Sequence, residues 1–409
     1  MKVTTGHQEL FSSLWCFPKR DVFDCVPLHY LILKMSGMGC ITPRPGIRNG
    51  STMTTLLDVG IFVLNLILAV SMMVYGTFIT QRHLQSPIMF IGLKMVNFTC
   101  YASTIYGLIS CFINRHEIWK FYNEAHAVDA MLEALGERTD FTRSFVLFVL
   151  YYGVAMGSCF LVIAVMYSEN IPWMLLLNLG YSYFSLTTFH IVSLTCMDVV
   201  WVRNVRLNKV FKKQFSLEGS IADAPALTVC GPKQALVLRQ IMQIFDNISD
   251  LADKGSFYYG IQIMVSVAGS FVYLLFYTFA FTLVIRSVLP FESVFNAGPI
   301  LSYLMFAYCV FIVAFFGNAL KQQDDMERIC SAEPYGRVVQ FTLSTCYCNV
   351  LFALSLFLRM FLMQLGHRSP MITCGLFPFD WTLIFSILST AATYIIILLQ
   401  FESAGNSSA

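Results

Sequence analysis

The chain has 409 residues, of which 57% are hydrophobic and only 12% are charged, and its mean hydropathy is +0.66. So few charged residues cannot cover the surface of a soluble globular protein, and the composition therefore predicts a polytopic membrane protein. The formal charge of +2 is close to neutral and gives no indication of a nucleic-acid partner.

Long apolar runs divide the chain into spans. A helix of about 20 apolar residues, rising about 1.5 Å per residue, crosses the roughly 30 Å hydrocarbon core of a bilayer. By this criterion the sequence predicts an all-α membrane protein with seven transmembrane helices. The predicted spans are residues 56–80, 88–113, 144–167, 171–201, 257–285, 300–319 and 380–401.

An eighth apolar run, residues 338–365, is ambiguous. Arg359 would lie inside it, and polar side chains crowd its first half. We interpret it as a cytoplasmic helix packed under the membrane. The alternative, an eighth crossing, would return the C-terminus to the cytoplasm.

The distribution of Lys and Arg predicts the orientation. The N-terminal segment and the segments after the second, fourth and sixth spans carry six, four, eight and five of them. The other side receives only Arg82 and Arg286, and Lys94 lies within the second span. Because basic residues favour the cytoplasmic side, the N-terminus is predicted to be cytoplasmic and the C-terminus extracellular.

Two cytoplasmic segments show the periodicity of amphipathic helices. Apolar residues from Ile118 to Leu135, and again from Leu238 to Ala252, follow steps of three and four. The fourth span, at 31 residues, is roughly 46 Å long and should project into the cytoplasm, and the fifth span has the same potential. We expect the amphipathic helices to pack on these projecting ends as a helical anchor region; helices lying flat on the inner leaflet are the alternative.

Polar and aromatic residues gather in the outer halves of the predicted spans. Such groups need partners inside a helix bundle, and a pocket lined with aromatic rings and amides suits a small organic ligand. The candidate ligand-binding residues are Lys94, Asn97, Tyr101, Asn178, Tyr181, Tyr277 and Tyr303. For each of them core or interfacial packing is the alternative, and Lys94 has the further option of extending its ammonium group to the outer surface.

Motifs for enzyme chemistry are lacking. The sequence has no His-Glu-x-x-His, Walker or Gly-x-Ser-x-Gly pattern, and Cys346 and Cys348 have no partners at zinc-finger spacing. His190 is interpreted as a satisfied core residue. We therefore predict neither an enzyme nor a bound cofactor or metal.

The end of the chain carries a recognisable signature. Thr393-Tyr394, five apolar residues and Gln400-Phe401 resemble the terminal motif of the insect gustatory receptor family, and the residues 375–380 before the last span resemble that family's approach to it. The resemblance is specific over roughly the last thirty residues. Elsewhere it rests on length, an inward N-terminus, seven spans and short outer loops.

This resemblance implies a tastant-gated, non-selective cation channel. The resemblance also implies a tetramer, in which four copies of the last helix surround a pore and a cytoplasmic anchor holds the subunits together. We expect a homotetramer, and a hetero-oligomer stays open. Thr393, Tyr394, Gln400 and Phe401 would carry the pore and gate, and Ile397 joins them because residues four apart share a helix face. A ring of Phe401 side chains would exclude water, and Glu402 at the outer mouth would attract permeant cations.

The expected organisation follows from these assignments. It comprises a cytoplasmic N-terminal segment, six helices with projecting cytoplasmic ends, a cytoplasmic anchor, a pore-lining seventh helix and an extracellular tail. Their bounds are 1–55, 56–320, 321–378, 379–402 and 403–409. The resemblance implies a multi-pass protein in the plasma membrane of sensory neurons.

The ligand class stays open at this point. The sugar-receptor branch resembles a version with Glu directly after the Thr-Tyr pair, where this chain has Ile395, and this difference favours a bitter compound or another nutrient. A secondary transporter of a small organic solute is the alternative function, although no inverted repeat supports it. A structural membrane protein without transport is a third.

Overall fold

The computed structural model describes most of the helical part of the chain. The described residues are 31–39, 42–43, 52–79, 87–137, 141–168, 173–215, 232–286, 297–321, 359–361, 363–364, 372–373 and 379–407. Most of the predicted helix 338–365, and most of the segments predicted to connect the spans outside the membrane, lie outside these ranges.

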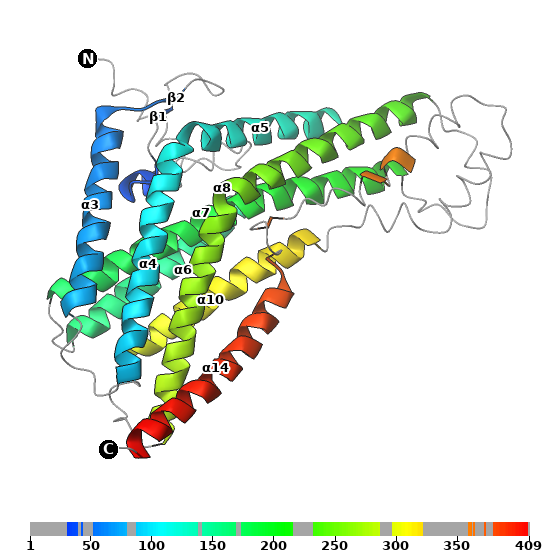
Figure 1. Ribbon diagram of the computed structural model, residues 1–409. Helices are drawn as coiled ribbons and strands as arrows, with labels where there is room; N and C mark the ends of the chain where they lie inside the picture. The colour runs from blue at the N-terminus through cyan, green and yellow to red at the C-terminus, as the bar shows by residue number, and fades with distance from the viewer. Residues whose placement is uncertain are drawn as a thin grey trace.

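Long helices dominate the described residues (Figure 1). They are α3 (Leu56–Ile79), α4 (Pro87–Ile113), α5 (Arg115–Ala134), α6 (Thr142–Ser168), α7 (Trp173–Phe215), α8 (Pro232–Ile285), α10 (Ala297–Lys321) and α14 (Trp381–Ser407). One pair of antiparallel two-residue strands, β1 (Thr42–Pro43) and β2 (Thr52–Met53), precedes them. Apart from this strand pair, the prediction of a helical membrane fold is confirmed. Each predicted span falls largely within one helix, and the fourth and fifth spans are parts of the longer helices α7 and α8.

Five of these helices are long and apolar enough to cross a membrane by themselves. The apolar segments are Leu56–Gly76, Lys94–Ile113, Leu176–Gln214, Ala235–Ile285 and Trp381–Phe401. Shorter apolar segments, Ser144–Ser158 and Phe306–Leu320, lie in α6 and α10. In Figure 1, α3, α8 and α14 all end on the lower side of the molecule, while α5 lies on the upper side.

Two helices are much longer than a bilayer core requires. The 43 residues of α7 and the 54 residues of α8 correspond to roughly 65 Å and 80 Å at about 1.5 Å per residue. Both project beyond the other helices, toward the right in Figure 1. The prediction that these helices exceed the length of a bilayer core is therefore confirmed, and the side of the membrane on which they project stays a prediction.

The sequence analysis treated the Leu238–Ala252 stripe and the fifth span as separate helices. This was wrong, because both belong to the continuous helix α8. Gly255 lies inside this continuous helix, although glycine ordinarily disfavours a helix interior. In the structure a Cβ at Gly255 would lie only 2.7 Å from the Cys196 sulfur of α7. The glycine permits close packing of α8 on α7 and does not end the helix.

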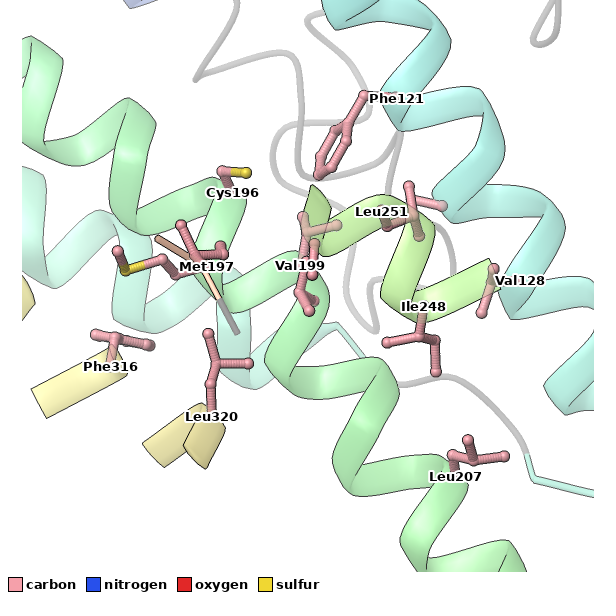
Figure 2. Packing of buried hydrophobic residues seen from close by; sticks show 14 of the residues in the cluster. Phe121, Val128, Cys196, Met197, Val199, Leu207, Ile248, Leu251, Phe316 and Leu320 are labelled. Carbon is pink, nitrogen blue, oxygen red and sulfur yellow. The ribbon is translucent and has the colours of Figure 1, made fainter. Parts of the chain in front are cut away.

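The projecting ends of α7 and α8 form a core together with α5 and α10. Figure 2 shows Phe121 and Val128 of α5, Val199 of α7, and Ile248 and Leu251 of α8 within this cluster. Of the predicted α5 stripe, Phe121, Ala125, Val128 and Leu132 are buried, and Ile118 and Leu135 pack at its edge. The stripes thus pack against other helices of the same chain, as predicted.

A buried ion-pair network fixes α5 to α7. The Asp129 carboxylate accepts hydrogen bonds from Arg203 and, at 2.8 Å, from Arg206. Arg203 also donates to the backbone carbonyls of Ala125 and Val199, at 3.0 and 2.6 Å. Burial raises the pKa of Asp129, and the two guanidinium groups counteract that rise. Because such charges are costly to bury unpaired, the network specifies the register of α5 on α7.

The start of α14 is fixed to α10. The Asp380 carboxylate accepts a hydrogen bond from the backbone N–H of Thr382 at 2.9 Å, which caps the first turn of α14. A Cβ at Gly317 of α10 would lie 1.3 Å from the backbone oxygen of Phe379, so only glycine permits this approach. The Trp381 ring meets Phe311 edge-on, with centroids 5.4 Å apart.

Candidate functional site

The last helix, α14, has two different sides. A half-buried stripe with steps of three and four runs along one of them, and α14 packs on α8 and α10. The stripe consists of Ile384, Ile387, Ala391, Ile395 and Leu398. The opposite side is exposed from Thr382 to Phe401. This helix is apolar and long enough to span a membrane, yet its own chain covers only one side of it. It therefore requires lipid, other subunits or both around the exposed side.

Small polar side chains follow this exposed side. The polar residues are Thr382, Ser386, Ser389, Thr393 and Gln400, all exposed and spaced by four, three, four and seven. At about 100° per residue these positions lie on one face of α14, opposite the half-buried stripe. The Ser386 and Thr393 hydroxyls donate to the carbonyls four residues earlier, at 2.8 and 3.1 Å. Hydroxyl and amide groups are more stable in contact with water than in contact with lipid, so this face is compatible with a water-filled pore.

The predicted gate residues divide between two positions on this helix. Ile397, 38% exposed, lies beside Gln400 on the polar face. Phe401 is 66% exposed and Tyr394 is 50% exposed. Both lie at the flank of the polar face, because Phe401 is about 100° around the helix from Gln400, and Tyr394 is about 100° from Thr393. Glu402 lies in the last turns of α14. The helix runs on to Ser407, six residues past the predicted end of the span.

Three of the predicted ligand residues form a polar network between α3, α4 and α7. The Tyr101 hydroxyl lies 2.8 Å from both the backbone oxygen and Oδ1 of Asn178, and the Asn178 amide donates to the carbonyl of Met72 at 2.8 Å. Tyr181 donates to the carbonyl of Asn65 at 2.9 Å. Tyr101 and Asn178 are fully buried, so in this structure their polar groups join helices of the same chain.

The other predicted ligand residues lie nearby or in a separate aromatic cluster. Asn97 is buried beside the Asn178 amide and Gly76, whereas Lys94 is half-buried, about one helical turn from Asn97 on α4. Tyr277 of α8 and Tyr303 of α10 have ring centroids 5.1 Å apart.

Tyr273 and Phe306 extend this aromatic cluster. The rings of Tyr273 and Phe306 are stacked at 4.3 Å, and Tyr273 also stacks on Tyr277 at 6.1 Å. Tyr183 of α7 reaches Phe306 at 6.0 Å. Three helices thus contribute rings to one place, and aromatic groups of this kind suit an organic ligand.

His190 occupies the interior of the bundle, as predicted. It is buried, and its Nε2 lies 2.7 Å from the Ser266 hydroxyl of α8. Within the described part of the chain, no group of three or more His, Cys, Asp or Glu side chains is arranged to hold a metal ion.

Sequence reasoning missed two features. The polar face of α14 was not recognised, although the spacing of Thr382, Ser386, Ser389 and Thr393 follows a helical period. An aromatic-lined cavity between α6, α7 and α10 was missed as well. The steps of four and three that join Phe141, Phe145 and Phe148 were the signal for it.

Together the long apolar helices and the exposed last helix define a helical membrane protein. Comparison with known proteins agrees. The family model of the 7tm chemosensory receptors matches residues 26–405, and the chain therefore belongs to that family. The resemblance to insect chemoreceptors seen in the C-terminal motif is thereby confirmed.

Individual relatives are distant in sequence. "Putative gustatory receptor 28b" of Drosophila melanogaster is 22% identical over 321 residues, which cover 72% of this chain and 66% of that receptor, just under two thirds of its length. The solved insect olfactory receptor OR5 from Machilis hrabei has a TM-score of 0.59 at 13% identity, with 92% of this chain and 97% of that chain covered. The same receptor in complex with eugenol gives 0.55 at 11% identity, with the same coverage. These structures share the fold with this chain.

Proposed function

We propose that this protein is a gustatory receptor that acts as a tastant-gated, non-selective cation channel. In this proposal four copies assemble so that α14 lines a central pore. The observation that carries it is the polar face of α14, which is turned away from the other helices of its own chain. A hydroxyl-lined face on an otherwise apolar helix suits contact with water and cations.

The proposed orientation has seven crossings, with the N-terminus in the cytoplasm and the C-terminus outside. The basic residues support it, with twenty-three on one side and two on the other. The core formed by α5 and the projecting ends of α7 and α8 would then belong to the cytoplasmic side, with residues 321–378 as part of the anchor. Under this proposal the protein resides in the plasma membrane of sensory neurons.

The proposed ligand is a small organic tastant that binds between the outer halves of the helices. The aromatic cluster around Tyr277 and Tyr303 supports this location, because it combines rings from α7, α8 and α10 near the end of the bundle where α8 ends. The solved complex of the olfactory receptor OR5 with eugenol is a related case of a small aromatic ligand. Calcium imaging of cells expressing this chain, with a panel of bitter compounds, sugars and other nutrients, tests the proposal.

The proposed closed gate is a ring of apolar side chains at the level of Ile397 and Phe401. Ile397→Ala and Phe401→Ala should each produce current without ligand, because a hydrophobic constriction that excludes water is widened. Leu398→Ala is the matched control: Leu398 is half-buried on the side toward α8 and α10, at the same height. If both gate variants keep the low basal current of the wild type while reaching the cell surface, the pore assignment is wrong.

Glu402 is proposed to stand at the outer mouth of the pore. Four carboxylates there would raise the local concentration of cations, so Glu402→Lys should lower the cation conductance or change the selectivity. Single-channel recording measures both quantities. Unaltered conductance and reversal potential would exclude Glu402 from the permeation path.

A further inference from the structure

A cavity lies beside α10 at Phe316, about three and a half helical turns from Tyr303 of the aromatic cluster. It opens where α6, α7 and α10 meet α5, with Tyr122 contributed by α5 and Phe316 by α10. The cavity has a volume of about 60 Å³. A single water molecule requires roughly 10–15 Å³ on the same measure, so there is room for a molecule about the size of one ring.

Aromatic rings dominate the lining. They belong to Tyr122, Phe141, Phe145, Phe148, Tyr151 and Phe316. Among the fourteen lining residues that the structure describes, Asp198 is the only charged one, and Ser144 and Thr195 add hydroxyl groups. Tyr151 of α6 and Phe316 of α10 have ring centroids 6.1 Å apart. The electron-rich faces of such rings and a carboxylate both favour a positively charged group.

The ion-pair network of Arg203, Arg206 and Asp129 borders the cavity at Phe141, whereas Asp198 lines the cavity itself. The Arg203 guanidinium lies 5.6 Å from the centroid of the Phe141 ring, and it is already bound to Asp129. A smaller cavity of about 20 Å³ adjoins the first one and shares Tyr151, Ile191 and Leu194 with it. The space therefore continues into the bundle, where Thr187, His190 and Tyr308 also line it.

We propose that this cavity is a second small-molecule site, which binds a protonated amine attached to a compact aromatic or apolar body. Asp198 accepts a hydrogen bond from the ammonium group, and the rings of α6 and α10 surround the apolar part. The site is distinct from the tastant pocket proposed above, and it does not depend on channel activity.

Three ligands of nearly equal shape test the charge preference. Benzylamine, benzyl alcohol and benzoate are titrated into the purified full-length protein in nanodiscs at pH 7, and ligand-observed NMR gives each dissociation constant. We expect benzylamine to bind about tenfold more tightly than benzyl alcohol, and benzoate more weakly than both. Benzoate binding as tightly as benzylamine would overturn the proposal.

Two variants locate the binding. Asp198→Asn should raise the dissociation constant of benzylamine about tenfold and leave that of benzyl alcohol within about twofold. Ser144→Phe fills the cavity and should weaken both ligands, whereas Tyr277→Ala, in the other aromatic cluster, should change neither. Melting temperatures of all variants identify those that fold. If correctly folded Asp198→Asn binds benzylamine like the wild type, Asp198 does not hold the amine and the proposal is refuted.

The ammonium group has two natural sources, a free amine with an apolar body or the ethanolamine headgroup of a membrane lipid, which shares the ammonium group but not the apolar body. Nanodiscs that contain phosphatidylethanolamine are compared with nanodiscs of phosphatidylcholine and phosphatidylglycerol. Weaker benzylamine binding in the ethanolamine lipid assigns the site to a headgroup, and equal binding assigns it to a free amine. Because binding is measured without current, loss of the channel proposal would leave this result unaffected.

Discussion

The buried Asp129 carboxylate decides how firmly α5 is attached to α7. Asp129→Ala removes the acceptor of Arg203 and Arg206, whose side chains are 0% and 9% exposed. Removing one partner of a buried ion pair costs about 3–5 kcal/mol, because a charge is left in the interior without compensation. The predicted effect is a decrease of about 5 °C or more in the melting temperature, with α5 detaching from the core.

Glu124→Ala is the matched control for this prediction. Glu124 also lies on α5 and also pairs with a basic residue of another helix, Lys254 of α8, but these two side chains are 33% and 36% exposed. Exposed pairs contribute about 0–1 kcal/mol, so the control should stay close to the wild type. Fluorescence-detected thermal unfolding of the purified variants measures both. Equal melting temperatures for the two variants would show that burial does not govern the contribution of Asp129.

Two further substitutions test packing inside the bundle. Gly317→Ala should reduce the amount of folded protein on size-exclusion chromatography, because the new Cβ would meet the Phe379 carbonyl oxygen and overpacking costs roughly 1–3 kcal/mol. In the control Gly157→Ala the new Cβ would have nothing within 4 Å, so this variant should keep the wild-type amount. The reverse order would contradict a tight α10–α14 contact. Tyr101→Phe should lower the melting temperature, because it removes a buried hydrogen bond to Asn178 and leaves an acceptor unsatisfied at a cost of about 1–3 kcal/mol, and an unchanged value would argue against that bond.

The helices were predictable because a membrane imposes a simple rule on them. Long apolar runs must form helices in order to satisfy their backbone polar groups, so residues 56–80 and 300–319 anticipated α3 and α10 closely. Amphipathic periodicity identified α5 and the stripe of α8 in the same way. The continuity of α8 was not predictable, because Gly255 reads locally as a break and its role depends on Cys196 of a different helix.

The candidate sites were predictable only in part. Among the candidate ligand residues, Tyr277 meets Tyr303 and Tyr101 meets Asn178, and their role in ligand binding stays a prediction. The sequence cannot distinguish a polar residue that joins two helices from one that faces a ligand, because both are buried and hydrogen-bonded. The cavity beside Asp198 depends on gaps between three helices, and composition carries no record of such gaps.

One helix connects the two ends of the proposed mechanism. Tyr303 lies in the aromatic cluster and Gly317 receives the backbone of Phe379, and both belong to α10. The fourteen residue steps from Tyr303 to Gly317 span about 21 Å of continuous helix. A shift of α10 caused by a ligand at Tyr303 would therefore move the first turn of α14, where Asp380 caps the helix and Trp381 packs on Phe311. The face of α14 opposite its half-buried stripe is exposed from Thr382 to Phe401. Under the proposed function, a tilt of α14 about its contact with α10 would be the motion that opens the pore.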